Sequence, residues 1–174
     1  MNKDKRLRVC WFSAGVSSFI AAYLSKPDKI IYIDVADQHP DSMRFVKDCE
    51  CVLEKKIEIL KSPYGSVENA CLAANCIRMA RTGYAPCTDF LKKRVRKEWE
   101  AQQTKPLTYI WGMDFAEKKR AERLIDTMPN QNHEFPLIER QLSKHDAHEI
   151  SERLGVKRPL MYDMGYNNNN CIGW

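Results

Sequence analysis

Six consecutive small residues near the N-terminus have the chemistry of an anion site. They follow an apolar stretch, and we call them the serine loop (residues 13–18): Ser13, Ala14, Gly15, Val16, Ser17 and Ser18. Small side chains let the backbone approach a phosphate, and N–H groups at the start of a following helix can donate to its oxygens. The pattern is neither a P-loop nor the three-glycine dinucleotide fingerprint. A serine-rich turn that only caps a helix therefore stays open as the alternative.

A run of positive charge is the second chemical feature, and it consists of Lys92, Lys93, Arg94, Arg96 and Lys97. Such a run is typical of a solvated helix face. The alternatives are an anion site or a surface that faces RNA. The whole chain carries 28 basic against 23 acidic residues, a net charge of +5.

The thiols and imidazoles do not form a recognisable metal site. Seven cysteines, an odd number in a chain of this length, argue against a disulfide framework and favour free thiols in a reducing cytoplasm. The spacing of Cys71 and Cys76 matches no common zinc framework, and His145 with His148 on one helix face is too small a ligand set. We therefore predict no bound metal.

Strands and helices alternate along the chain. Apolar runs predict buried strands over 7–12, 29–35, 56–60 and 107–113. Helices are predicted over 16–24, 41–53, from Ser66 towards Met79, over 88–103, and after the caps Asp114 and Ser143, with Gly155 as the last stop. This order predicts an α/β, Rossmann-like fold, with a mostly parallel sheet of about five strands and helices on both faces. The serine loop should lie at the carboxyl edge of that sheet.

Composition limits the class of protein. A chain of 174 residues with 44% apolar and 29% charged residues favours one globular domain. No apolar run approaches the roughly 18 residues of a membrane-spanning helix, so we expect no membrane partner. The apolar stretch behind the basic N-terminus is interrupted at once by serine and glycine, which argues against a signal peptide.

The serine loop and several later motifs together resemble a known family. Ser-x-Gly-x-x-Ser after the first strand is similar to the PP-loop of the adenine nucleotide alpha hydrolase superfamily. Other stretches resemble, in the right order, motifs of its phosphoadenosine phosphosulfate (PAPS) reductase-like branch. They are Pro86-Cys87-Thr88 with Leu91-Lys92, Trp111-Gly112-Met113-Asp114 with Glu117 and Arg120-Ala121, Phe135-Pro136-Leu137-Ile138, Leu160-Met161-Tyr162-Asp163-Met164-Gly165-Tyr166, and Cys171-Ile172-Gly173. The resemblance covers nearly all of residues 1–174.

The resemblance implies an adenine nucleotide at the sheet edge, namely ATP, PAPS or adenylyl sulfate, and a thioredoxin-like reductant as partner. Combined with position in the chain, it gives the expected nucleotide contacts Ser13, Ala14, Gly15, Val16, Ser17, Ser18, Asp34, Lys92, Arg94, Gly112 and Arg120. The expected active thiols are Cys171, in a polar loop that can swing over the nucleotide, and Cys87.

Three departures from the family pattern narrow the interpretation. Ser17 stands where metal-using pyrophosphatase members carry aspartate, so a magnesium contact is lost, and Mg²⁺ is expected at most together with ATP. Pro86 and Trp174 stand where the cysteine pairs of an iron–sulfur cluster would be completed, so we predict no four-iron cluster. Family members usually continue past this end, so the domain is expected to be either naturally short or truncated at its C-terminus.

Two classes of function follow. The first is an enzyme that acts at the phosphate or sulfate of an adenine nucleotide with thiol-based sulfur chemistry. The second is a catalytically reduced module that binds the nucleotide, or binds RNA through its basic helix. An ATP-dependent adenylating enzyme of tRNA or nucleobase modification is a further alternative to the first.

Overall fold

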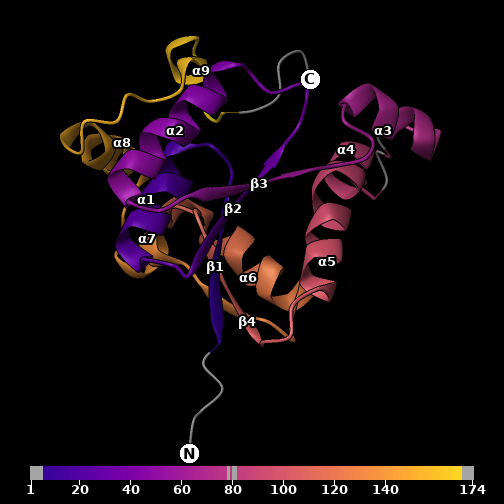
Figure 1. Ribbon diagram of the computed structural model, residues 1–174, viewed down its shortest axis with the longest axis horizontal. Coiled ribbons are helices and arrows are strands. Elements are labelled where there is room, and N and C mark those ends of the chain that lie inside the picture. Colours follow the sequence, from indigo (N-terminus) through magenta and orange to yellow (C-terminus); the bar gives the residue numbers. More distant parts are fainter. Residues whose placement is uncertain (1–5, 78, 80–81, 170–174) are drawn as a thin grey trace, which may run out of the picture.

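A parallel sheet forms the centre of the computed structural model, which describes residues 6–77, 79 and 82–169. In this part of the chain the strand order is β3-β2-β1-β4-β5, and every neighbouring pair is parallel (Figure 1). The strands are β1 (Leu7–Phe12), β2 (Lys29–Asp34), β3 (Ile57–Lys61), β4 (Leu107–Trp111) and β5 (Asn132–Glu134). The predicted α/β, Rossmann-like fold is thus confirmed.

β1 lies in the middle because its sequence is apolar toward both faces. Its last four residues, Val9 to Phe12, are all buried, as expected for a parallel strand that is covered on two sides. Cys10 pairs in register with Ile30 of β2 and Ile110 of β4.

Helices cover both faces of the sheet (Figure 1). One face, with Cys10, Phe12 and Ile110, packs against α1, α2, α7 and α8. These helices span Val16–Ser25, Asp41–Leu53, Pro136–Glu139 and Lys144–Arg153. The other face, with Trp11 and Tyr109, packs against α5 (Arg94–Ala101) and α6 (Lys118–Thr127). The prediction of helices on both faces is confirmed.

Capping residues begin and end the helices where the sequence placed them. Ser66 accepts a hydrogen bond from the Asn69 N–H, and Asp114 and Ser143 each form a capping box. Asp114 opens the 3₁₀ turn η2 (Phe115–Glu117) ahead of α6. Gly155, with φ +75°, follows the end of α8 as predicted.

Three element predictions were wrong in extent. α3 (Val67–Ala74) ends well before Met79, because Asn75 turns left-handed (φ 49°) and the Cys76 N–H then bonds back to the Cys71 carbonyl. The helix predicted over 88–103 is divided into α4 (Pro86–Thr88), the π-helical turn η1 (Asp89–Lys93) and α5. The fourth strand stops at Trp111 rather than residue 113.

The sequence pattern did not identify β5, which is short and polar. Its pairing with β4 is supported by the Trp111 indole N–H, which donates to His133 Nδ1 at 3.0 Å. The His133 ring also stacks against Phe135. This strand is therefore stabilised by tertiary contacts and is not specified by a local sequence pattern.

A close backbone approach joins α1 to the end of β4. Gly112 lies so near the first turn of α1 that a Cβ at this position would be 2.4 Å from Ser18 Cα and 2.5 Å from Ser18 N. Both of these atoms belong to the backbone and cannot move aside as a flexible side chain would. Glycine at position 112 therefore fixes how the serine loop sits against β4.

An ion-pair network ties the C-terminal segment to α2. Arg44 donates to Asp41 (2.7 Å) and Asp48, and also to the backbone carbonyls of Lys157 (3.1 Å) and Arg158 (3.2 Å). Asp41 in turn accepts the Leu160 N–H at 2.8 Å. The segment leading into α9 (Leu160–Asp163) is held above α2 in this way.

Among the described residues, no helix combines the length and apolarity needed to cross a bilayer.

We expect Gly112→Ala to lower the free energy of unfolding by about 2–3 kcal/mol, because the added Cβ overpacks against backbone. Gly65→Ala is the matched control: Gly65 has φ +72° but open space around its Cα, so left-handed strain alone should cost about 1 kcal/mol. Urea unfolding measures both. Equal losses in the two variants would contradict the close approach at Gly112.

We also expect the Asp41 network to make stability depend on acid. Hydrogen bonding from Arg44 holds the pKa of Asp41 below its usual range. A carboxylate with a lowered pKa stabilises the fold at neutral pH, and this contribution is lost as pH falls below about 4. Asp41→Asn should cost about 1–2 kcal/mol at neutral pH and progressively less in acid. The more exposed Asp48→Asn should cost under about 0.5 kcal/mol.

Candidate functional site

The serine loop lies where the winding of the sheet reverses. α1 leaves β1 toward one face, and α6 leaves the neighbouring β4 toward the other. In open parallel sheets such a switch point, at the carboxyl ends of the strands, is where ligands bind. The predicted position of the loop is confirmed.

Ser18 organises the loop from within. Its hydroxyl accepts the Ser13 N–H at 3.1 Å and donates to the Gly15 carbonyl at 2.8 Å, and the Ser13 hydroxyl lies 3.1 Å from it. Ser18 is 2% exposed. We predicted its hydroxyl as a ligand contact, and in this structure it holds the loop in shape.

The first turn of α1 presents backbone N–H groups at the serine loop. The N–H groups of a first helical turn have no intrahelical acceptor, and Gly15, the N-cap, adds no side-chain cap. Ala14 is buried with φ 56°, a left-handed backbone that is costly for a residue with a Cβ. Val16 donates its N–H to the Tyr162 hydroxyl at 3.3 Å. Ser17, half-buried, is the loop hydroxyl for which no internal bond is found in the described part of the chain.

Two residues from the C-terminal part of the chain, Tyr162 and Asn169, cover the serine loop. The Tyr162 hydroxyl would be 3.1 Å from a Cβ at Gly15, so it lies directly over the loop. Burial raises the pKa of this phenol, which keeps it protonated and able to donate. Asn169 donates its side-chain amide to the Ala14 carbonyl (2.7 Å) and the Ser42 hydroxyl (3.0 Å).

The sequence analysis did not identify Tyr162 or Asn169 as residues of the site. Tyr162 lies in a stretch that resembled a family motif, but no role was assigned to it. Asn169 belongs to the Asn167–170 run, whose composition indicated only a polar loop. Nothing local in either stretch points to a loop about 150 residues away, and only the resemblance to the motif offered a signal for Tyr162.

The remaining predicted contacts lie on four different elements: β2, η1, α5 and α6. Asp34 ends β2, 3.7 Å from the Lys61 amine. Arg94 pairs with Asp89 at 3.2 Å and stacks on Phe90, with its Cζ 3.5 Å from the ring centroid. Arg120 pairs with Glu117 at 2.5 Å on the exposed start of α6. Lys92 and Lys93 are exposed on η1.

Gly112 is thus the one predicted residue from outside the loop for which direct packing on the loop is found among the described residues. The cationic contacts predicted at 92, 94 and 120 instead lie on η1, α5 and α6. Their role toward a nucleotide stays a prediction.

Cys87 lies in a small group of thiols beyond the carboxyl end of β2. It packs with Cys71 near Val35 and Phe90. The backbone bond from Cys76 to Cys71 brings those two cysteines together, and burial with the neighbouring Cys87 and Cys76 raises the pKa of the Cys71 thiol. Cys171, the other predicted active thiol, and Trp174 lie outside the described residues.

A cluster of potential metal ligands occurs on the surface of α8. His145, Asp146 and Glu149 approach one another there, but Asp146 already holds the Ser143 N–H and hydroxyl. Glu149 likewise lies near His145 and Arg153. This exposed group supports no metal assignment.

Comparisons with known proteins identify the fold. No family model matches the chain, and no curated protein matches its sequence. Its structure is similar to that of phosphoadenylyl-sulfate (PAPS) reductase from Candida auris, solved as a phosphate complex, with a TM-score of 0.66 and 14% identity over 95% of this chain and 82% of that chain. A predicted tRNA methyltransferase subunit from Methanocaldococcus jannaschii gives a TM-score of 0.47 and 15% identity, over 85% of this chain and 75% of that one. This chain therefore has the fold of PAPS reductase, as its motifs implied.

Proposed function

We propose that this chain is a PAPS reductase-like PP-loop enzyme that binds an adenine nucleotide with a phosphate or sulfate at the serine loop. One observation carries the proposal: the first turn of α1, whose N–H groups have no intrahelical acceptor, lies at the switch point of the sheet in a chain with the fold of PAPS reductase. The related structure was itself solved with phosphate, which supports an oxyanion as the ligand.

The residues in and around the loop would have different roles in binding such a group. The N–H groups of the first turn and the Ser17 hydroxyl donate to the phosphate oxygens, and the helix dipole adds attraction. Ser18 and Gly112 keep the loop in the required shape. The Tyr162 hydroxyl can donate its hydrogen to a ligand oxygen while its own oxygen still accepts the Val16 N–H.

The chemistry that we propose depends on a thiolate. Cys171 follows Asn169 by two positions in the sequence, and Asn169 donates to the Ala14 carbonyl of the loop, which supports the choice of Cys171 as the proposed thiol. A thiolate there can attack the sulfur of an activated sulfate, which breaks the bond between that sulfur and the phosphate oxygen, releases the nucleotide and leaves an S-sulfonate (Cys–S–SO3⁻) on the enzyme. A thioredoxin-like dithiol would then reduce the new S–S bond, becoming a disulfide itself, so that sulfite leaves and the thiol is regenerated. No metal is required for this step, and Mg²⁺ would enter only bound to ATP.

We expect Ser17→Ala to weaken binding of adenosine 3′,5′-bisphosphate or ATP about tenfold, because one charge-assisted hydrogen bond is lost. Ser25→Ala, at the other end of α1, is the matched control and should bind as the parent does. Gly15→Val should bind more weakly still, since its side chain fills the space under Tyr162. Calorimetric titration measures all three, and parental affinity in Gly15→Val would exclude the loop as the site.

We expect Cys171→Ser to abolish turnover without changing nucleotide affinity. Sulfite release from PAPS or adenylyl sulfate and pyrophosphate release from ATP are the two assays, and they separate a reductase from an adenylating enzyme. Cys51→Ser, exposed on α2, is the control. Full turnover by Cys171→Ser would shift the role to Cys87. Binding without turnover by the parent protein would instead support the reduced binding module.

A further inference from the structure

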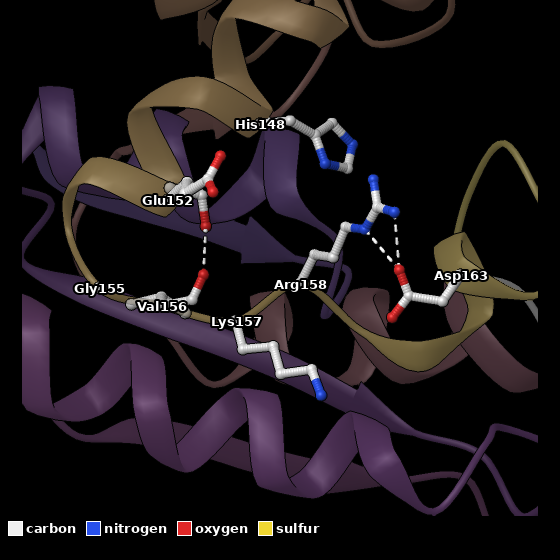
Figure 2. A pocket seen from close by; sticks show the side chains of 8 residues that line it. His148, Glu152, Gly155, Val156, Lys157, Arg158 and Asp163 are labelled. Carbon is white, nitrogen blue, oxygen red and sulfur yellow. Dashed lines mark hydrogen bonds and ion pairs between the residues drawn. The ribbon is translucent and has the colours of Figure 1, made fainter.

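A cavity of about 560 Å³, with no serine-loop residue in its lining, lies beside the His148 ring, which packs against Tyr162; we call it the second cavity. It is formed by the last turns of α8, the loop that follows and α9. Its lining consists of His148, Ser151, Glu152, Gly155, Val156, Lys157, Arg158 and Asp163 (Figure 2). The sequence motifs gave no role to His148 or Arg158.

Two nitrogen-bearing side chains meet in this cavity. Figure 2 shows the His148 imidazole and the Arg158 guanidinium projecting toward one another from α8 and from the loop. The Nε and Nη2 atoms of Arg158 both lie 2.7 Å from a single oxygen of Asp163, so Nη1 remains available to a ligand. Lys157 adds a further positive charge to the lining.

His148 lacks the partner that its buried atom requires. Its Nδ1 is inaccessible to solvent, and no hydrogen bond to it is found within the described residues. The ring packs edge-on against Tyr162 at 4.6 Å between centroids, which fixes its orientation. Burial, with the nearby charges of Arg158, Lys144 and His145, lowers the pKa of His148, so the ring is neutral at pH 7.

The backbone around the cavity is rigid. Ser151 donates its hydroxyl to the Val156 carbonyl at 3.0 Å, and Arg44 binds the carbonyls of Lys157 and Arg158. The cationic side chains therefore project from a loop that is anchored to both α8 and α2. Such anchoring lowers the entropy cost of binding a small ligand.

We propose that this cavity is a second oxyanion site, which takes a tetrahedral anion such as sulfate or phosphate between Arg158 and His148. The anion would accept hydrogen bonds from Arg158 Nη1 and from a ring N–H on the edge of the His148 imidazolium that faces Arg158 (Figure 2). The carboxylates of Glu152 and Asp163 also line the cavity and repel an anion, so the anion must lie at Nη1 of Arg158, the guanidinium nitrogen that Asp163 does not bind. The anion can be free or can be a second anionic group of the nucleotide.

Sulfate is the probe that tests the proposal, because unlike phosphate it does not titrate near neutral pH. Binding is measured without nucleotide, by calorimetry and by the NMR signals of His148, at about pH 5.5 and about pH 8. An anion stabilises the charged imidazole, so sulfate should raise the pKa of His148, and affinity should be higher at the lower pH. Unchanged His148 signals at saturating sulfate would overturn the proposal.

Variants separate the cavity from the serine loop. Arg158→Gln should weaken sulfate binding at least about tenfold, and Arg158→Lys, which keeps the charge, should give an intermediate loss. His148→Gln should remove the dependence on pH. Arg153→Gln, exposed on the same helix and paired with Glu149, is the control and should change nothing. Parental sulfate affinity in Arg158→Gln would overturn the proposal.

Gly15→Val distinguishes this proposal from the proposed function. If Gly15→Val loses nucleotide binding but keeps the response of His148 to sulfate, both sites stand. If Gly15→Val alone abolishes sulfate binding, the anion belongs to the loop and the second site fails. In the parent protein, sulfate and adenosine 3′,5′-bisphosphate can be tested for competition at His148. Competition identifies the natural occupant of the cavity as an anionic group of the nucleotide, and simultaneous binding identifies it as a free anion. Both outcomes support the cavity site.

Discussion

The contact between the backbones of Gly112 and Ser18 is the constraint on which the site depends. It joins the end of β4 to the first turn of α1, and a single Cβ would push them apart. With this contact in place, the Ser18 hydroxyl can bond both to the Ser13 N–H and to the Gly15 carbonyl. The N–H groups of the helix then face the switch point of the sheet, where an anion can reach them.

Several hydrogen bonds hold the C-terminal segment over the serine loop. Ala14 adopts a left-handed backbone, and its carbonyl is held by the buried amide of Asn169. Arg44 and Asp41 anchor the segment from α2, so Tyr162 reaches the Val16 N–H. The ring of Tyr162 also packs against the His148 ring, so Tyr162 contacts both the serine loop and a residue that lines the second cavity. The left-handed backbone of Ala14 puts strain at the serine loop, as is common at functional sites.

The charged residues of η1, α5 and α6 show why a basic run is weak evidence of a site. Arg94 is engaged by Asp89 and Phe90, and Arg120 by Glu117, so part of this charge is used within its own segment. Surface pairs of this kind contribute little to stability and are easily exchanged for a ligand. Arg44 and Arg158, which the charge pattern did not single out, are instead held by carboxylates at the C-terminal segment: Arg44 by Asp41 of α2, and Arg158 by Asp163.

The sequence by itself determined the parts that local physics controls. Continuous apolar runs specified β1, β2 and β4, capping residues set the helix starts, and small residues after β1 identified the serine loop. Its motifs also implied the fold that the structural likeness establishes. The tertiary structure decided what depends on residues far apart in the chain: the β5 pairing through Trp111 and His133, and the position of Tyr162 and Asn169 over the serine loop. Local propensity carries no information on such pairs, because their energy exists only once the sheet has brought the two segments together.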